Sequence, residues 1–408
     1  MSKILVVGGG PSGIMSAITA AKNGHEVVLL ERNGELGRKL KATGGGRCNF
    51  TNYREIEDFF DKIVTNKKFL YSSFYTFTNR DLISFFEENS LEYKVEEEND
   101  FKVYTKNDKS VELIDTLNKI LINNKVKIMY NKKVEDFIVE KNEENSKVTG
   151  VLLDSGEKIY SDKVIVSTGG MSYTHTGSDG STYSVLAKYG HDIKKIYPAL
   201  VPLKIKDQWI KNLQGVSMKN VDVMWKVKKK KFHKVGDMLF THFGITGPCI
   251  LKVSSYINKI LEENEVELTI DFLPEISGEE IINVIKKQPS RNIVNNLKEI
   301  LPQNFSKEII IKLNLSDKKA SDMTKSEEQM IIEEIKNMKL VCDGTTGLNT
   351  AMVTSGGVSV KDIDSSTMKS KKIDNLYITG ELIDIDAETG GYNLQIAFST
   401  GYLAGLSV

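Results

Sequence analysis

A glycine-rich turn between an apolar strand and a helix constrains the fold of this chain more than any other feature. Residues 3–7 form a short apolar run, residues 8–13 follow with the spacing Gly-x-Gly-x-x-Gly, and residues 14–23 have helical periodicity with small residues on one face. Residues 26–30 form a second apolar run. In such a unit the glycines allow a tight turn, a close approach of the backbone to a pyrophosphate, and close packing of the helix on the strand. The sequence therefore predicts an α/β fold with a doubly wound sheet that binds a dinucleotide.

Two features beside this turn indicate how a dinucleotide is held. The helix after the turn offers unpaired N–H groups and the positive end of its dipole to the phosphates, and Ser12 adds a hydroxyl group. Glu31 ends the second strand, where a carboxylate accepts hydrogen bonds from a ribose diol. We expect both groups to contact the cofactor.

Two later blocks favour FAD over NAD as the tightly bound cofactor. The strand 163–168 runs into Gly169-Gly170, which lets the backbone pass close to the adenine side of FAD. The strand 375–379 leads into an acidic turn, and the helix expected from about 391 to 405 directs N–H groups at the flavin. No second Gly-x-Gly-x-x-Gly unit indicates a separate NAD(P)H domain. The predicted cofactor-binding residues are Gly8, Gly10, Pro11, Ser12, Gly13, Glu31, Arg32, Arg38, Lys39, Gly45, Gly46, Arg47, Asn49, Val134, Thr168, Gly169, Gly170, Gly380, Glu381, Asp386, Gly391, Tyr392, Asn393, Leu394 and Gln395.

The stretch 37–52 is the most distinctive part of the sequence. Three successive glycines at 44–46 require unusual backbone conformations or a close ligand, and four basic residues in the stretch supply positive charge for phosphates. Together with the blocks 8–13, 241–248, 354–358 and 380–395, this stretch resembles the YhiN/BaiN-like family of FAD-dependent flavoproteins. The resemblance spans essentially the whole chain.

The resemblance implies a Rossmann-like FAD domain of the two-dinucleotide-binding type, with an inserted β-barrel-like domain and a small helical insert. The sequence agrees, because short alternating runs begin near residue 195 and residues 276–335 have helical periodicity. We expect the FAD-binding domain at 1–193 and 343–408. We expect the β domain at 194–274 with a return at 326–342, and the helical insert at 275–325.

The resemblance also implies an oxidoreductase that takes electrons from NADH or NADPH as a transient reductant. Substrates described for the family include steroid enones, small aminoketones, and a uridine of large-subunit ribosomal RNA that becomes dihydrouridine. We therefore expect hydride transfer to an activated C=C bond, with the protein supplying orientation and flavin electronics. The alternatives are an rRNA dihydrouridine synthase, a small-molecule ketone or amine oxidase, and a non-catalytic flavin-stabilised RNA-binding factor.

Two residues are candidates for proton supply. Cys48 follows an arginine in the glycine-rich stretch, and a thiol tuned by that charge can act as a general acid; otherwise it is a small buried residue under the cofactor. His242 lies in a loop with two glycines and a proline, and either orients or protonates the substrate or caps its own turn. The candidate residues on the substrate side are Thr241, Gly244, Thr246, Thr354, Gly356 and Gly357.

Residues 226–234 contain six lysines and no carboxylate. The flanking apolar runs predict that this stretch is the tip of a β-hairpin in the inserted domain. A lysine-rich tip is often just a solvated turn. Alternatively, the lysines at 228–231 contact an RNA backbone, with Phe232 or Trp225 available for stacking; the candidate contacts are Lys228, Lys229, Lys230 and Lys231.

The composition excludes several other classes. Lys+Arg and Asp+Glu are 55 each, so a globally basic nucleic-acid binder is excluded. Three scattered cysteines indicate no disulfide framework and no metal site. No apolar run reaches the roughly 20 residues of a membrane span. Since the chain enters a strand at residue 3 without a signal peptide, we expect a cytoplasmic protein with no membrane contact.

Overall fold

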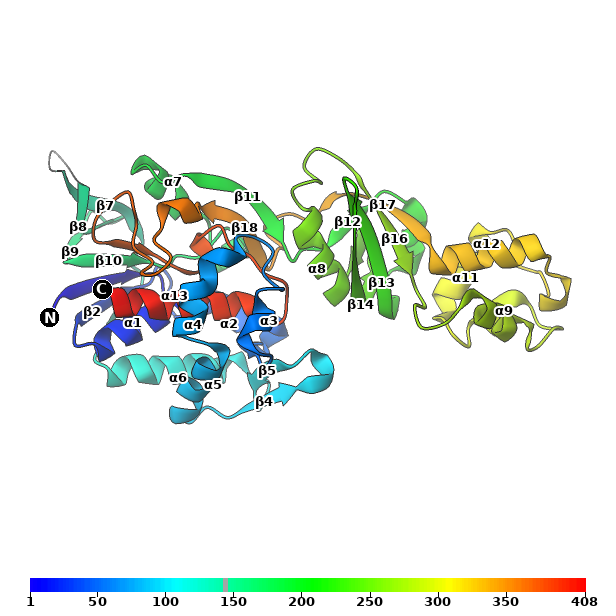
Figure 1. The fold of residues 1–408 in the computed structure, drawn as a ribbon, viewed down its shortest axis with the longest axis horizontal. Coiled ribbons are helices and arrows are strands. Elements are labelled where there is room, and N and C mark those ends of the chain that lie inside the picture. Colours follow the sequence, from blue (N-terminus) through cyan, green and yellow to red (C-terminus); the bar gives the residue numbers. More distant parts are fainter. Residues whose placement is uncertain (142–145) are drawn as a thin grey trace. The chain divides into compact units, whose positions relative to one another are not determined.

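The computed structural model describes residues 1–141 and 146–408, which form two compact units (Figure 1). The first unit contains Met1–Ala199 and Leu348–Val408, and the second contains Leu200–Gly347. Each unit has its own hydrophobic core. The predicted fold class, an α/β domain from both ends of the chain with an inserted barrel and helices, is confirmed. The finer domain boundaries inside the insertion remain a prediction.

A five-stranded parallel sheet forms the centre of the first unit. Its strands lie in the order β19-β10-β1-β2-β6, and every neighbouring pair is parallel. Because the strands are parallel, their carboxyl ends meet at one edge of the sheet, where ligands bind in folds of this kind. The strands are β1 (Lys3–Val7), β2 (Glu26–Leu30), β6 (Lys127–Met129), β10 (Lys163–Val166) and β19 (Leu376–Ile378).

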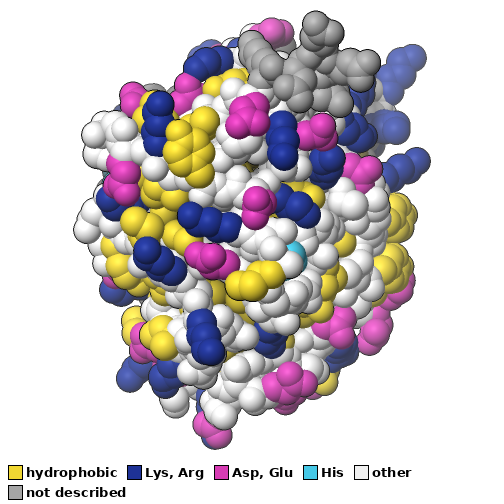
Figure 2. Space-filling view, turned by 90° about the vertical axis from the view of Figure 1, so that its left-hand side faces the viewer, with side chains coloured by type: hydrophobic (Ala, Val, Ile, Leu, Met, Phe, Trp, Pro, Cys, Tyr) yellow, Lys and Arg dark blue, Asp and Glu magenta, His cyan; other side chains and the backbone are white. Residues whose placement is uncertain are grey.

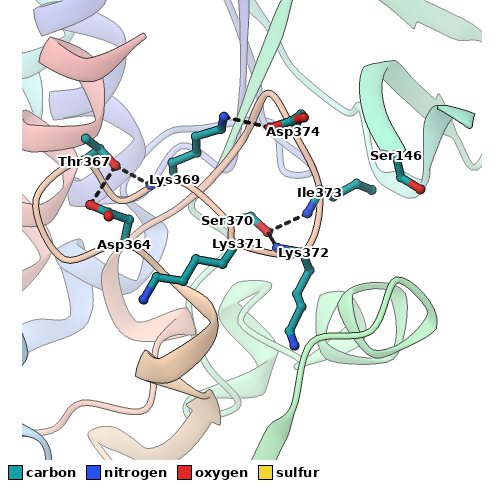
Figure 3. A pocket seen from close by; sticks show the side chains of 9 residues that line it. All are labelled: Ser146, Asp364, Thr367, Lys369, Ser370, Lys371, Lys372, Ile373 and Asp374. Atoms are coloured by element: carbon teal, nitrogen blue, oxygen red, sulfur yellow. Dashed lines mark hydrogen bonds and ion pairs between the residues drawn. The ribbon is translucent and has the colours of Figure 1, made fainter. Parts of the chain in front are cut away.

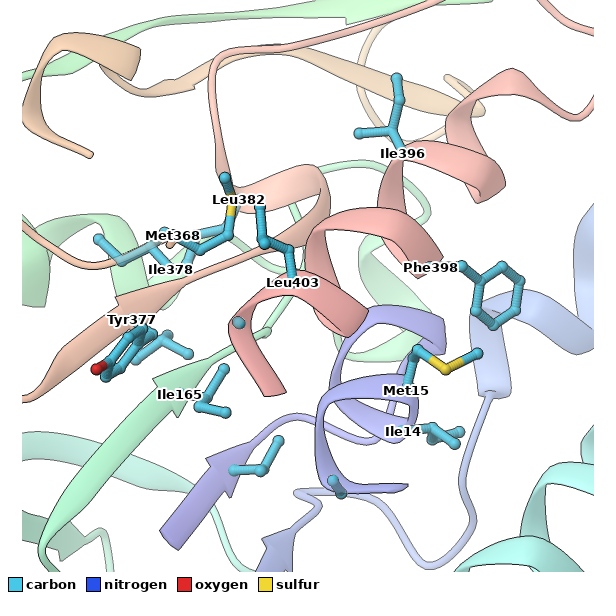
Figure 4. Packing of buried hydrophobic residues seen from close by; sticks show 14 of the residues in the cluster. Ile14, Met15, Ile165, Met368, Tyr377, Ile378, Leu382, Ile396, Phe398 and Leu403 are labelled. Atoms are coloured by element: carbon cyan, nitrogen blue, oxygen red, sulfur yellow. The ribbon is translucent and has the colours of Figure 1, made fainter. Parts of the chain in front are cut away.

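The first and last long helices of the first unit, α1 (Pro11–Lys22) and α13 (Tyr392–Ser407), lie side by side (Figure 1). Two glycines of α13 permit this approach, because a Cβ at Gly401 would lie 2.3 Å from the Ser12 carbonyl oxygen and a Cβ at Gly405 2.7 Å from that of Ser16. Figure 4 shows the apolar side chains that pack around both helices. The end of the chain therefore positions the helix that follows the glycine-rich turn.

Smaller elements complete the first unit. Three strands form an antiparallel meander, β7–β8–β9, and β11 pairs antiparallel with β18. The short strands are β3 (Thr51–Asn52), β4 (Tyr93–Glu96), β5 (Lys102–Thr105), β7 (Val134–Lys141), β8 (Ser146–Leu153), β9 (Lys158–Tyr160), β11 (Ile193–Ala199) and β18 (Val353–Val358). The helices are α2 (Arg38–Ala42), α3 (Ile56–Phe59), α4 (Tyr71–Thr76), α5 (Asn79–Glu88), α6 (Ser110–Asn123) and α7 (Ser181–Lys188).

The second unit is a closed six-stranded barrel with attached helices. Its strands lie in the order β12-β15-β14-β13-β16-β17. They are β12 (Leu203–Ile205), β13 (Ser217–Val227), β14 (Lys230–Phe240), β15 (Gly244–Thr246), β16 (Val266–Asp271) and β17 (Met338–Thr345). The helices are α8 (Pro248–Ile257), α9 (Gly278–Lys286), α10 (Ile293–Leu297), α11 (Gln303–Lys312) and α12 (Lys325–Lys336). No helix of the described residues is long and apolar enough to cross a membrane.

The predicted lysine-rich hairpin is confirmed. It consists of β13 and β14, which pair antiparallel from Ser217 opposite Leu239 to Val227 opposite Lys230. Only Lys228 and Lys229 lie between the strands, so most of the lysines belong to the strands themselves.

Candidate cofactor-binding site

The glycine-rich turn leaves an open approach to the start of α1. Gly8 has a φ of 104°, and its N–H donates to the Leu30 carbonyl oxygen at 2.8 Å. A Cβ at Gly13 would lie 1.9 Å from the Gly8 carbonyl oxygen, whereas a Cβ at Gly10 would meet no atom within 4 Å. The unpaired N–H groups of the first turn of α1 therefore lie beside open space suited to phosphate oxygens.

Glu31 is buried at the carboxyl end of β2, and donors fix its carboxylate. Oε2 accepts from the Gly9 N–H at 2.7 Å, and Oε1 accepts from the main-chain N and the side-chain amide of Asn33, each at 2.7 Å. The Gly9 contact joins the carboxylate to the glycine-rich turn. This position is compatible with the predicted ribose contact, since each oxygen of a carboxylate accepts about two hydrogen bonds.

Two further observations fit a bound FAD. The Thr168 hydroxyl and the Asn49 amide oxygen are buried without a hydrogen-bond partner among the described residues. Gly45 and Gly46 have φ of 65° and 94°, and a Cβ at either would meet no atom within 4 Å. Buried polar atoms are normally hydrogen-bonded, so the unpaired atoms and the open glycine faces are consistent with a ligand that has both donors and acceptors.

A polar cluster of Lys39, Ser172, Thr354 and Glu381, called the Lys39 cluster below, lies where β19 ends. The Lys39 ammonium donates to both oxygens of Glu381, at 2.9 and 2.7 Å, and to the Ser172 hydroxyl at 2.6 Å. The Thr354 N–H and the Ser172 hydroxyl also donate to Glu381 Oε1, at 2.9 and 2.8 Å. The sequence analysis did not identify Ser172. Its position two residues after Gly169-Gly170 is the one sequence feature that points to it.

The pKa of Glu381 reflects this cluster. Burial alone would raise the pKa of this carboxyl, but the charge of Lys39 and the hydrogen bonds outweigh it and hold the pKa below its usual 4.5. The sequence predicts Glu381 as a cofactor-binding residue. In the structure its carboxylate connects α2, the loop after β10, the start of β18 and the end of β19.

The structure pairs most of the basic residues predicted to bind the cofactor with carboxylates. Arg32 forms an ion pair with Asp179 at 2.7 Å, and Lys39 with Glu381. Arg47 contacts both Glu96 and Asp108. Arg38 donates only to the Asn33 amide oxygen, at 3.3 Å, and has no carboxylate partner among the described residues.

These pairings reduce the positive charge that the basic residues can supply to the cofactor's phosphates. Arg38 and the N-terminus of α1 remain as the positive groups suited to that role.

The side chains at the start of α13 pack against or hydrogen-bond to other parts of the protein. Gly391 has a φ of 92° and precedes the helix, and a Cβ there would lie 2.4 Å from the Thr51 carbonyl group. Tyr392 is fully buried against Phe59, at 4.9 Å between ring centroids. Gln395 donates to the Phe77 carbonyl oxygen at 3.2 Å. The main-chain N–H groups of the first turn are therefore the part of this block best placed for the flavin.

The other predicted residues of the block also have internal roles. The Asn393 amide exchanges hydrogen bonds with the main chain of Ala387, at 2.8 and 3.0 Å. Asp386 accepts from the Ser355 hydroxyl at 3.0 Å. Gly380 lies close to α1, because a Cβ there would be 2.9 Å from the Ser12 Cβ. Outside the block, Val134 pairs with Leu153 at the start of β7.

Cys48 is fully buried in the hydrophobic core of the first unit. Burial raises the pKa of its thiol to about 12. The guanidinium of Arg47 stacks on Tyr104 at 4.1 Å and faces its two carboxylates. The expected activation of the thiol by Arg47 is therefore wrong, and its packing role is the better supported alternative.

His242 lies in the turn between β14 and β15 of the second unit and is exposed. The turn is closed by Thr241, whose N–H donates to the Gly244 carbonyl oxygen at 2.8 Å and whose hydroxyl accepts from the Gly244 N–H at 3.1 Å. His242 packs edge to face on Phe243 at 5.0 Å. The alternative that His242 caps its own turn is wrong, because Thr241 has that role.

Packing explains three of the substrate-side candidates. A Cβ at Gly244 would lie 2.1 Å from the Leu203 carbonyl oxygen. Gly356 and Gly357 have φ of 97° and 126°, and a Cβ at each would lie 2.1 Å from the Lys195 and 2.5 Å from the Leu382 carbonyl oxygens. Thr354 belongs to the Lys39 cluster, and Thr246 pairs with Leu239 between β14 and β15.

A separate cavity of about 510 Å³ lies near the loop 364–374 and contains none of the predicted site residues (Figure 3). Two of its three lysines are paired with carboxylates, Lys369 with Asp374 at 2.7 Å and Lys372 with Asp362 at 3.2 Å. Within the described residues no group of three His, Cys, Asp or Glu side chains could hold a metal ion.

Residues 2–407 match the HI0933-like protein Rossmann domain. The chain is 31% identical over 413 residues to the 3-dehydro-bile acid delta(4,6)-reductase of Clostridium scindens, covering 99% of this chain and 98% of that one. It is 29% identical over 410 residues to the ribosomal RNA dihydrouridine synthase of Haemophilus influenzae, covering 100% and 98%. A solved 3-ketosteroid-delta4-(5alpha)-dehydrogenase from Rhodococcus jostii shares the fold, with a TM-score of 0.52, 14% identity, and coverage of 100% and 96%.

The family match covers nearly the whole chain, including the glycine-rich turn, the stretch 37–52 and the start of α13. It agrees with the resemblance that these blocks carry and with the open, partly unpaired surface described above. The chain belongs to the HI0933-like family of Rossmann-domain proteins and is an FAD-dependent oxidoreductase.

Proposed function

We propose that the protein reduces a C=C bond conjugated to a carbonyl group, with NADH or NADPH as the electron donor. The observation that carries the proposal is the full-length similarity to two reductive enzymes, one named for a keto bile acid and one for a uridine. The double bonds that the two names imply both lie next to a carbonyl group. In the net reaction NAD(P)H gives a hydride to one carbon, the other carbon takes a proton, and NAD(P)⁺ leaves.

When bound, FAD supplies the two-electron transfer between the donor and the substrate. The residues of this chain bind and orient it. The N-terminus of α1 and Arg38 would hold the phosphates, Glu31 the ribose, and the first turn of α13 would place positive main-chain groups near the flavin ring. Such groups favour negative charge on the ring.

Anaerobic assays of the FAD-loaded protein test this proposal. We expect NADH or NADPH absorbance to fall when an α,β-unsaturated ketone is present, and to stay constant with the saturated ketone of the same skeleton. Equal consumption with both ketones, or consumption only after oxygen is admitted, would contradict a conjugated-bond reductase and favour the oxidase alternative.

A further inference from the structure

The lysine hairpin, residues 226–234, has a local charge that the cofactor site does not explain. It contains six lysines and no carboxylate, in a chain whose formal net charge is zero. On the face of the protein drawn in Figure 2, basic and acidic side chains are interspersed. The hairpin departs from that pattern.

Five of the six lysines of the hairpin have no carboxylate partner among the described residues. Lys226 and Lys228–Lys231 are exposed and form no ion pair within residues 1–141 and 146–408. Other lysines of the same unit do find carboxylates, such as Lys219 with Asp237 at 2.6 Å and Lys206 with Glu265 at 2.7 Å. Single exposed lysines without an ion pair also occur elsewhere, but at the end of the hairpin five of them lie within residues 226–231.

The register of the two strands increases this charge concentration. Lys226 lies directly opposite Lys231, and Lys230 is opposite Val227. Like charges directly opposite one another destabilise an antiparallel pair. A bound polyanion would remove that repulsion and release counterions, which favours binding at low salt.

An aromatic pair lies beside the lysines. Phe232 is opposite Trp225 and stacks on it, with 5.7 Å between the ring centroids and 18° between the planes. Trp225 is 3% exposed and Phe232 37% exposed, so the indole fixes a ring that solvent still reaches. Lysines along a strand with a fixed, exposed aromatic ring are the groups that hold a phosphodiester backbone and stack a base.

We propose that the lysine hairpin binds a single strand of nucleic acid, with its lysines on the phosphates and Phe232 against a base. The proposal does not depend on the conjugated-bond reaction, because it concerns binding by a different part of the chain. An anionic lipid surface would use the lysines but not a ring already packed on Trp225, so the strand of nucleic acid is favoured.

The proposal can be tested by fluorescence anisotropy, with the FAD-loaded protein and labelled U12 RNA or dT12 DNA. The oligonucleotide that binds more tightly shows whether the hairpin prefers RNA or DNA. The test variant replaces Lys228, Lys229, Lys230 and Lys231 with glutamine. The matched control replaces four other lysines with glutamine, so both variants lose the same charge. These lysines are exposed and form no ion pair within the described residues; they are Lys68, Lys287, Lys307 and Lys319.

We expect wild-type protein to bind at least one oligonucleotide in about 50 mM KCl. The hairpin variant should bind at least about 10-fold more weakly. The slope of its log affinity against log salt should also be smaller by up to about 3, because each lost phosphate contact lowers the slope by roughly 0.7. The control variant should stay within about two-fold of wild type. Phe232→Leu should weaken binding about 5-fold or more without changing the slope.

Three outcomes would overturn the proposal. The first is no binding of either oligonucleotide by the wild-type protein. The second is an equal loss in the hairpin and control variants, which would mean that only net charge matters. The third is binding to phosphatidylglycerol vesicles without binding to the oligonucleotides. The circular dichroism spectrum and the thermal unfolding midpoint, expected to be equal in all variants, verify that they are folded. The double variant Lys228→Gln with Lys229→Gln provides a milder change.

Discussion

The charge of the Glu381 carboxylate contributes to the stability of the folded state. Its lowered pKa means that the folded state favours the ionised carboxylate, which Lys39 and the neighbouring hydrogen bonds stabilise. This contribution is present above the usual pKa of 4.5 and is lost as pH falls through the lower folded value. We expect Glu381→Gln to lower the free energy of unfolding of flavin-stripped protein by about 1–3 kcal/mol at neutral pH.

The difference between wild type and Glu381→Gln should therefore shrink in acid, below about pH 4.5. Urea unfolding at several pH values measures it. Glu98→Gln is the control, because Glu98 is exposed and forms no ion pair among the described residues. A difference that stays constant into acid would show that shape rather than charge accounts for the effect.

A substitution at Gly10 should affect cofactor binding without affecting folding. Its φ and ψ of −83° and 179° suit any residue, and a Cβ there meets no atom within 4 Å. Gly10→Val should therefore fold normally but place methyl groups where the phosphates approach. We expect protein with a normal circular dichroism spectrum and no bound flavin, and full flavin occupancy would refute the assigned phosphate site.

The sequence shows which residues are charged, but it did not predict which residues form ion pairs with them. Three residues predicted to bind the cofactor have ion-pair partners within the protein. Arg32 pairs with Asp179, and Glu381 pairs with Lys39. Arg47 pairs with both Asp108 and Glu96. The partners are distant in sequence, as Lys39 and Glu381 are 342 residues apart. No local pattern encodes such a pair, because it forms only when the tertiary fold brings the strand ends together.

At the scale of elements the sequence was more informative. The strand 3–7 agrees with the structure, because an apolar run encodes a strand locally. The hairpin expected with its tip at 226–234 is also present, but its turn is shorter, since only residues 228–229 lie between the strands. The helix expected at 14–23 begins earlier, at Pro11. Proline is favoured at the first helical position, and this signal was available in the sequence.

The contact between α1 and α13 gives a prediction at the element scale. A side chain at Gly401 would collide with the Ser12 carbonyl oxygen, only 2.3 Å from the Cβ position, and would displace the helix that carries the phosphate site. We expect Gly401→Val to lower stability by about 1–3 kcal/mol and to weaken FAD binding as well. Gly344→Val is the control, since the nearest atom there is 4.0 Å away. Unchanged flavin titrations for Gly401→Val would contradict the coupling.

At the scale of the whole molecule, the two units have separate cores, and the chain provides a natural probe for each. Both tryptophans, Trp209 and Trp225, lie in the second unit, whereas the predicted FAD contacts lie in the first. The wavelength of tryptophan emission therefore reports unfolding of the barrel unit. Flavin release reports unfolding of the FAD-binding unit.

Excess FAD should stabilise only the unit that binds it. At about 100 times Kd, mass action adds about 2.7 kcal/mol to that unit and should raise its midpoint of thermal flavin release by about 5–10 °C. We expect the midpoint of the tryptophan emission shift to stay unchanged in the same scans. If both midpoints rise together, the two cores unfold as one cooperative block, and the division into two units does not extend to stability.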